Sequence, residues 1–94
     1  MTRYLVERRY HVGQGEVPNV AKRSRQLRED HYPEIIWEHS HVVLDEAGTP
    51  MSFCVYEAPD EQTVRRHAEE LGYHDIVALY EIAGDVTPED FPLD

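Results

Sequence analysis

Hydrophobic and polar positions alternate along four short segments of the chain, and apolar residues recur at helical spacing along two others. Alternation at every second residue is typical of strands, whereas apolar residues three or four apart indicate a helix. Strands are predicted at residues 3–9, 34–45, 51–58 and 75–83, and helices at residues 18–30 and 61–71. This order of elements predicts an α+β domain of the ferredoxin-like βαββαβ type.

The ends of both predicted helices carry residues that favour helix boundaries. Pro18 suits the first turn of a helix, where its missing N–H is not needed, and Pro33 follows the end of the same helix. Asp60 is the predicted N-cap of the second helix, and Gly72 its C-cap. The outer face of the first helix is expected to be basic, with Lys22, Arg23, Arg25 and Arg28.

The uncovered face of the predicted sheet points to a dimer. Each helix joins strands that must run parallel, and the right-handed crossover rule then favours a four-stranded antiparallel sheet with both helices on one face. The other face is expected to carry large side chains such as Trp37 and Tyr56. Such a face calls for a second copy of the chain, so we expect a homodimer in which two stacked sheets form a dimeric α/β barrel.

Length and charge narrow the classes of function. With 94 residues the chain is expected to form one domain at residues 1–84, followed by an acidic, proline-containing tail at residues 85–94. The net charge of −10 repels phosphate backbones, which argues against nucleic-acid binding, and attracts cations. No segment has the roughly 20 apolar residues that a membrane span requires.

Cysteine usage indicates the compartment. Cys54 is the only cysteine, so an internal disulfide is excluded. A free thiol suits a reducing environment, and residues 1–7 lack the apolar run of a signal peptide. We therefore expect a cytoplasmic protein.

Two histidines on one predicted strand are the clearest candidates for chemistry. His39 and His41 are two residues apart, so they should project from one face, about 6.5–7 Å from each other along the strand. Imidazoles so placed can bind one metal ion, and imidazole suits nickel, copper and zinc. If His39 faces Cys54 on the neighbouring strand, then Cys54, Trp37 and Tyr56 join this face, but a slip by one residue would separate them. The alternatives are two exposed histidines and a buried, inert thiol.

Glu7 and His67 are further candidates on other elements. His67 lies on the inner stripe of the second helix, where a histidine is either a functional group or a hydrogen-bonded core residue. It would then lie on the opposite side of the sheet from His39. Glu7 could serve as a ligand, as a base, or as the ion-pair partner of a basic residue such as Arg8 from a second copy.

Two other classes of function stay open at this point. Dimeric α/β barrels host isomerases, cyclases and monooxygenases of small molecules, and Glu7, His39, Cys54 and His67 include suitable acid–base groups. The other class is a regulatory or structural module that only dimerises or binds another protein. Such a module would tolerate replacement of His39 and Cys54.

Three stretches resemble a family of small bacterial ferredoxin-like proteins described as nickel-responsive or nickel-binding. They are WEHSHV at residues 37–42, CVYEAPDE at residues 54–61 and VRRHA at residues 64–68, and LVER at residues 5–8 is similar to the family's first strand. The resemblance implies a ferredoxin-like dimer and nickel binding. The positions that recur in the family correspond here to Glu7, Trp37, His39, Ser40, Cys54, Tyr56 and His67. His41 stands where the family more often has a tyrosine, which adds a candidate ligand.

The residues and the resemblance together predict a homodimer that binds a divalent metal. Nickel is the favoured ion, with zinc and copper as alternatives. The candidate ligands are Glu7, His39, His41, Cys54 and His67.

Overall fold

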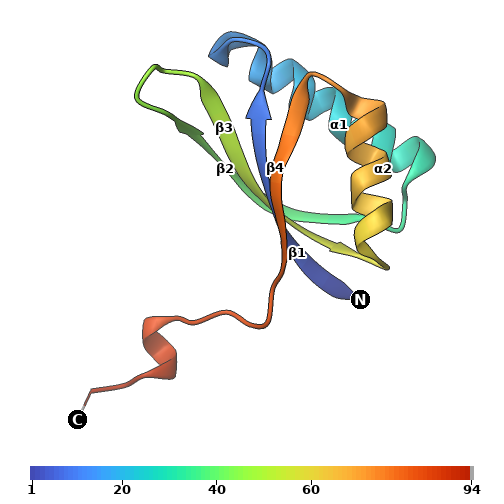
Figure 1. The fold of residues 1–94 in the computed structure, drawn as a ribbon. Coiled ribbons are helices and arrows are strands. Elements are labelled where there is room, and N and C mark those ends of the chain that lie inside the picture. The colour runs from blue at the N-terminus through green and yellow to red at the C-terminus, as the bar shows by residue number, and fades with distance from the viewer. Residues whose placement is uncertain (94) are drawn as a thin grey trace.

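The computed structural model describes residues 1–93 and contains the predicted series of strands and helices (Figure 1). The strands are β1 (Thr2–Tyr10), β2 (Ile36–Leu44), β3 (Pro50–Ala58) and β4 (His74–Glu81). The helices are α1 (Val17–His31) and α2 (Glu61–Leu71), and two short 3-10 turns are η1 (Gln14–Glu16) and η2 (Pro88–Asp90). Each predicted element is therefore present within two residues of its expected bounds.

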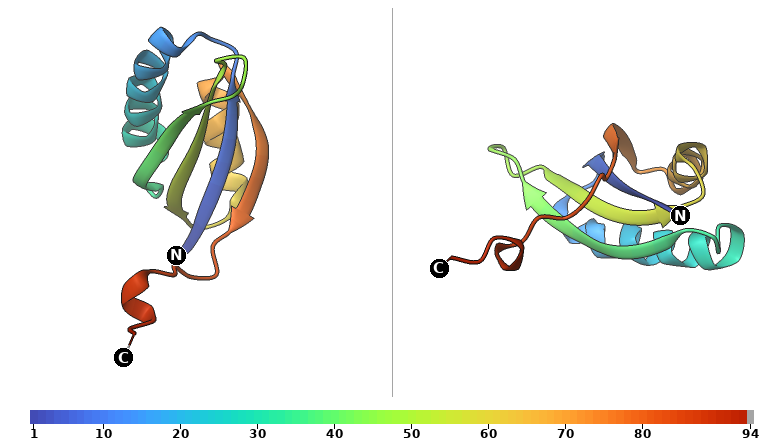
Figure 2. Two further views of the ribbon diagram at one scale, coloured as in Figure 1. Left: turned by 90° about the vertical axis from the view of Figure 1, so that its left-hand side faces the viewer. Right: turned by 90° about the horizontal axis from the view of Figure 1, so that it is seen from below.

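The four strands form one sheet in the order β2-β3-β1-β4, and all neighbours are antiparallel. Helix α1 connects the parallel strands β1 and β2, and α2 connects β3 and β4, with one strand lying between the members of each pair. Both helices lie on the same side of the sheet (Figure 1), and the left view of Figure 2 looks onto the side that no helix covers. The predicted ferredoxin-like α+β fold is confirmed.

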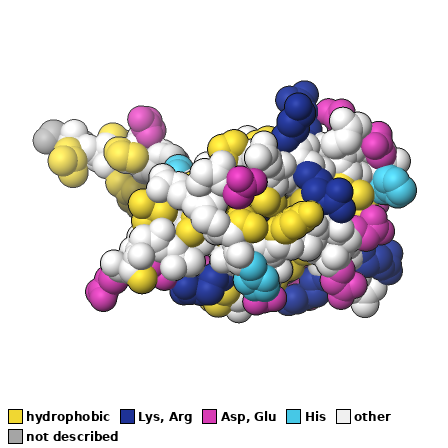
Figure 3. Space-filling model, turned by 90° about the horizontal axis from the view of Figure 1, so that it is seen from above, with side chains coloured by type: hydrophobic (Ala, Val, Ile, Leu, Met, Phe, Trp, Pro, Cys, Tyr) yellow, Lys and Arg dark blue, Asp and Glu magenta, His cyan; other side chains and the backbone are white. Residues whose placement is uncertain are grey.

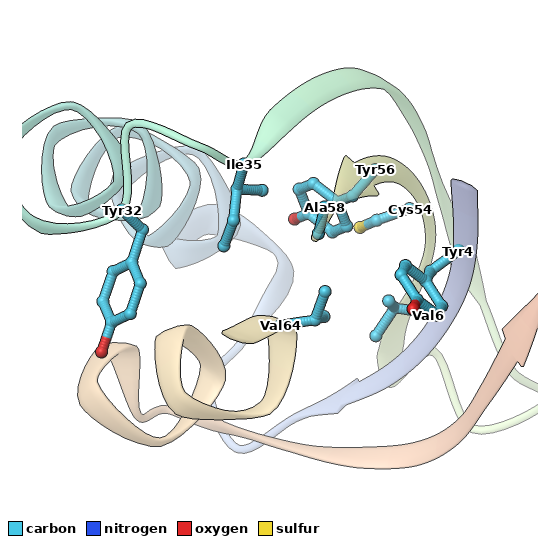
Figure 4. Packing of buried hydrophobic residues seen from close by; sticks show 8 residues of the cluster. All are labelled: Tyr4, Val6, Tyr32, Ile35, Cys54, Tyr56, Ala58 and Val64. Carbon is cyan, nitrogen blue, oxygen red and sulfur yellow. The ribbon is translucent and has the colours of Figure 1, made fainter. Parts of the chain in front are cut away.

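The hydrophobic core lies between the central strands and the helices (Figure 4). Val6 of β1 and Ala58 of β3 have no exposed surface, and Val64 of α2 packs against them. The other members of the core cluster are Tyr4, Tyr32, Ile35, Cys54 and Tyr56. The strand residues among these share the helix-covered face, which leaves the alternate residues of β1 and β3 for the uncovered face.

The helix caps follow the sequence prediction, but the polarity of α1 does not. The Asp60 carboxylate accepts a hydrogen bond from the Thr63 backbone N–H at 2.7 Å, and Gly72 ends α2 with φ of +69°. The expectation that Arg28 lies on an outer basic face is wrong, because this residue is buried at 8 % exposure. Its guanidinium lies 5.2 Å from the ring centroid of Trp37, so it packs between α1 and β2.

A tight turn sets the pairing of β2 with β3. The Asp45 carboxylate accepts a hydrogen bond from the Thr49 backbone N–H at 2.8 Å, and Gly48 turns the chain with φ of +80°. The loop therefore occupies residues 45–49, and the first cross-strand pair is Leu44 with Pro50. The register that would pair His39 with Cys54, and therefore Leu44 with Thr49, is excluded.

The observed register separates His39 from Cys54, which the alternative register would place side by side. Ser40, and not His39, lies opposite Cys54, and His39 lies opposite Val55. Because side chains alternate between the faces of a sheet, a shift of one residue places His39 and Cys54 on opposite sides. The cluster of His39 with Cys54 is therefore not formed.

A β-bulge in β2 places Trp37 on the opposite face of the sheet from the one predicted. The register shifts between Trp37 and His39, so that Trp37 lies opposite Tyr56. The extra residue, Glu38, turns the strand locally and moves Trp37 to the helix-covered face. The expectation that Trp37 shares a face with His39 is wrong for this reason.

The uncovered face also differs in composition from the prediction. Tyr56 belongs to the core, so neither it nor Trp37 lies on this face. Cross-strand partners share one face of a sheet, and Leu5 pairs with both Val55 and Tyr80. The rows across the uncovered face include Leu5, Glu7, His39, His41, Val43, Phe53, Val55, Ala78 and Tyr80.

The C-terminal segment leaves the sheet after β4. Residues 82–93 run away from the helices and strands in Figures 1 and 2. An ion pair of 2.8 Å between Arg3 and Asp85 holds the start of this segment next to β1. Within residues 1–93, no helix combines the length and the apolar character needed to cross a membrane.

Replacement of Gly72 by alanine tests the turn between α2 and β4. Gly72 has φ of +69° and ψ of −164°, a conformation that only glycine adopts without strain. We expect Gly72→Ala to lower the free energy of unfolding by about 1–3 kcal/mol in urea denaturation at a fixed protein concentration. Gly84→Ala is the matched control, because a Cβ there meets no atom within 4 Å and φ is not positive. Equal stability of the two variants would contradict the prediction.

Candidate functional site

His39 and His41 lie side by side on the uncovered face of the sheet. Their ring centroids are 5.5 Å apart and the ring planes meet at 79°. Both side chains are exposed on β2, an edge strand, opposite Val55 and Phe53 of β3. The spacing of two along a strand thus produces an adjacent pair of imidazoles that an ion can reach from solvent.

Glu7 shares this face but not the immediate surroundings of the histidines. It lies opposite Phe53 of β3, and Phe53 lies opposite His41, so one strand separates Glu7 from His41. The expectation that Arg8 could pair with Glu7 across a dimer is wrong, because Arg8 points to the helix side and is only 1 % exposed. Within residues 1–93, Glu7 forms no ion pair.

Cys54 and His67 lie on the opposite, helix-covered side. Cys54 is buried, with its Sγ 3.3 Å from the Ser52 hydroxyl. The five predicted ligands therefore divide into Glu7, His39 and His41 on one side, and Cys54 and His67 on the other. Among residues 1–93, no three His, Cys, Asp or Glu side chains are grouped closely enough to hold a metal ion.

His67 has the environment of a hydrogen-bonded core residue. It is 1 % exposed, and its Nε2 donates to the Ser24 carbonyl oxygen at 3.3 Å. The rings of Tyr32 and Tyr56 meet it edge-on, with centroids at 5.7 and 6.4 Å. Burial, together with the charges of nearby arginines, lowers the pKa of His67 to about 4. His67 is therefore neutral at pH 7.

Arg8 of β1 is a buried cation whose contacts are with neutral groups. Its Nη2 donates to the Tyr56 hydroxyl at 3.2 Å, and its Nη1 lies 2.5 Å from the Nε2 of His74. The Nδ1 of His74 donates to the Gly72 carbonyl oxygen at 2.7 Å, so Nε2 is the acceptor for Arg8. Burial and the charge of Arg8 lower the pKa of His74 to about 4, and burial raises the pKa of Tyr56 to about 12.

Several surface arginines, unlike Arg8, form ion pairs with carboxylates. Arg9 pairs with Asp45 at 3.0 Å, and Arg25 pairs with Glu29 at 3.1 Å. On the face in Figure 3, acidic and basic side chains are interspersed around hydrophobic ones. Exposed pairs of this kind contribute little to stability, whereas a buried charge without a counter-charge is costly. Within residues 1–93, Arg8 forms no ion pair with any acidic side chain.

A cavity of about 250 Å³ lies between α1 and the sheet. The helix contributes its first turns to one wall, and the edge strand β2 contributes Trp37, Ser40 and Val42 to another. Arg8 and Cys54 lie in the part formed by β1 and β3. The cavity is thus on the opposite side of the sheet from the histidine pair, and the two are separate candidate sites.

Sequence analysis did not identify Arg8, Arg28 or His74 as buried. A signal for Arg8 was present, because it continues the alternate row of Tyr4 and Val6 that faces the core. An arginine in an otherwise apolar row points inward if the row does. Arg28 gave a signal of the same kind, because it continues the helical row of Val17, Val20 and Ser24 that faces the core, whereas His74, at the first position of β4, gave none.

Comparison with known proteins places the chain among small ferredoxin-like proteins. Residues 4–76 match the family model described as "Nickel responsive protein SCO4226-like". The crystal structure of SCO4226 from Streptomyces coelicolor A3(2) is similar with a TM-score of 0.66 at 16% sequence identity, over 89% of this chain and 99% of that chain.

A second solved structure is similar, the solution structure of the C-terminal domain of the MgtC protein from Mycobacterium tuberculosis. Its TM-score is 0.59 at 12% identity, over 89% of this chain and 88% of that chain. At such low identity both structures establish the fold alone. None of the curated proteins matches this chain significantly.

Acid titration tests the two buried histidines. Because their pKa values are about 4 in the folded chain and near 6.5 when unfolded, the unfolded state takes up protons first as the pH falls. The contribution of these two histidines to the free energy of unfolding is therefore largest above about pH 6.5 and is lost as the pH falls toward 4. The total loss is roughly 2–4 kcal/mol after a discount for solvent screening. Urea denaturation at several pH values measures this slope. We expect His67→Gln to reduce the slope and His31→Gln, at an exposed position, to leave it unchanged. Identical slopes in all three proteins would contradict the assignment.

Proposed function

The chain belongs to the SCO4226-like family of nickel-responsive proteins, and from this premise we propose that it binds a divalent cation through His39 and His41. Nickel is the favoured ion, and zinc and copper are the alternatives that imidazole ligands also suit. The observation that carries the proposal is the adjacent, exposed pair of imidazoles on the uncovered face.

The spacing of the two rings is compatible with one shared ion. Metal–nitrogen distances of about 2.0–2.1 Å place the centroids of two ligating rings roughly 4.5–6 Å apart. The observed separation of 5.5 Å lies within this range. The net charge of −10 adds a long-range attraction for cations.

Two imidazoles leave coordination positions for further ligands, and a second copy of the chain could supply them. We propose a homodimer in which the uncovered faces stack on each other. Tyr80 and Val43 expose 57% and 37% of their surfaces on this side, and Leu5 and Phe53 lie between them. A two-fold contact over this face would enclose both histidine pairs in one interface. Glu7 lies on the same face and is the candidate carboxylate ligand from either copy.

The remaining predicted ligands have no part in this proposal. Cys54 and His67 lie beyond the sheet from His39, and the same separation removes the support for an enzyme that would use Glu7, His39, Cys54 and His67 together. The buried free thiol of Cys54 is compatible with a reducing environment, and we propose the cytoplasm as the location.

Calorimetric titration of chelator-treated protein with nickel tests the cation site. We expect wild-type protein to bind with a dissociation constant in the micromolar range, and the His39→Ala/His41→Ala double variant to lose this binding, because both donor nitrogens are removed. Zinc and copper titrations of the same protein establish the preference.

The matched control is the His11→Ala/His31→Ala double variant, which removes two other exposed histidines. It should bind nickel as the wild type does. Equal affinity of both double variants would refute the site, and loss of binding in both would indicate adventitious binding by surface histidines.

Sedimentation equilibrium tests the homodimer separately from the metal. We expect a dimer for the wild type and a monomer for Tyr80→Glu, because a charge on the stacked face would be buried without a partner. Val86→Glu adds the same charge to an exposed residue of the C-terminal segment and should leave the dimer intact. A monomeric wild type at micromolar concentration would rule out the proposed stacking.

A further inference from the structure

We propose that the cavity between α1 and the sheet binds a small organic carboxylate, with Arg8 as its counter-charge. The site is distinct from the histidine pair, because it lies on the other side of the sheet. The occupant is a molecule with one carboxylate group and an apolar body, such as a short fatty acid or an aromatic acid.

The charge of Arg8 has no acidic partner among residues 1–93. This residue is 1 % exposed, lines the cavity and has only the neutral groups of Tyr56 and His74 as partners. Its Nε is buried and has no hydrogen-bond partner among residues 1–93. Buried charges in proteins are usually paired and hydrogen-bonded. An anion in the cavity would supply the missing partner.

The remaining wall of the cavity combines two hydroxyl groups near Arg8 with a mainly apolar surface. Tyr10 and Ser52 line the cavity near Arg8, and their hydroxyl oxygens are 2.8 Å apart. The rest of the wall is mainly apolar, from Val17, Val20, Val42, Trp37 and Leu71. A polar, cationic end beside apolar walls suits an amphipathic anion, because the walls offer nothing to a strongly hydrated ion such as phosphate.

A second arginine strengthens the positive potential on this side of the sheet. Arg28 is also buried, its Nε has no partner among residues 1–93, and its guanidinium packs on the ring of Trp37. Trp37 in turn lines the cavity and is 39% exposed, so it lies at the boundary with solvent. The interior of an acidic protein is therefore cationic at this cavity, which selects anions that can enter it.

The size of the cavity limits the occupant. A cavity of about 150 Å³ in another protein accommodates benzene, and drug-sized ligands occupy about 300–1,000 Å³. A volume of about 250 Å³ thus fits a single ring or a short chain with one carboxylate. Nucleotides and long-chain lipids are too large.

Titration with hexanoate, followed by the fluorescence of Trp37, tests the proposal. Trp37 is the only tryptophan, so its emission reports on the cavity boundary. We expect saturable binding with a dissociation constant of roughly 10 µM to 1 mM, as is reasonable for about eight non-hydrogen atoms. Hexanamide, which has the same shape without the charge, should bind roughly 10- to 100-fold more weakly.

Two variants that each remove one arginine test whether Arg8 is the counter-charge of the bound carboxylate. Arg8→Met should weaken hexanoate binding roughly 10- to 100-fold, whereas Arg9→Met, which removes the neighbouring surface cation, should leave it unchanged. Should Arg8→Met fail to fold, Val42→Phe keeps the test available, since it fills part of the cavity from an exposed position, leaves Trp37 as the only tryptophan and should weaken or abolish binding.

Several outcomes would overturn the proposal. They are the absence of saturable hexanoate binding, equal affinity for hexanoate and hexanamide, competition by inorganic phosphate, and unchanged binding in both Arg8→Met and Val42→Phe. The His39→Ala/His41→Ala double variant should retain hexanoate binding, so failure of this site and failure of the nickel site can be told apart.

Discussion

The pairing of β2 with β3 determines which side chains can act together. The turn held by Asp45 starts the ladder at Leu44 and Pro50, and one extra residue at Glu38 then moves Trp37 to the helix-covered side. Because faces alternate along a strand, these two local features assign every side chain of β2. The histidine pair and the cavity are the consequences on either side of the sheet.

The chain as a whole is acidic, whereas the charged side chains buried in its core are arginines. Acidic residues outnumber basic ones by 19 to 9, and most of the arginines that form ion pairs do so at the surface. Arg8 and Arg28 are instead buried beside Tyr56, without carboxylates of the described chain as partners. Replacing buried charges by apolar residues is often neutral or stabilising, so packing of the core alone does not call for arginine at these two positions. The proposed cation site and the proposed anion site lie on opposite sides of the sheet.

The elements and caps were predictable from the sequence, whereas the partners across the sheet were not. Asp60, Gly72 and the alternation through His39 and His41 are local signals, and local structure follows them. Alternate residues on both faces of β2 include apolar side chains, so either register with β3 would bury some of them. The hydrophobic periodicity therefore does not determine the register. The bulge depends on contacts between distant segments, which the spacing of residues along the chain does not encode, whereas the burial of Arg28 follows the helical row of Val17, Val20 and Ser24.

The central position of β1 also governs how the chain can fold as it is synthesised. The first strand pairs with β3 on one side and with β4 on the other, and Arg8 and His74, which meet across the second of these pairs, are 66 residues apart in the sequence. At translation rates of roughly 5–20 residues per second, β1 waits roughly 3–13 s for its last neighbour. Within this domain, the first strand to be synthesised is thus the last to be paired on both edges, and one of its edges stays open until the final strand emerges.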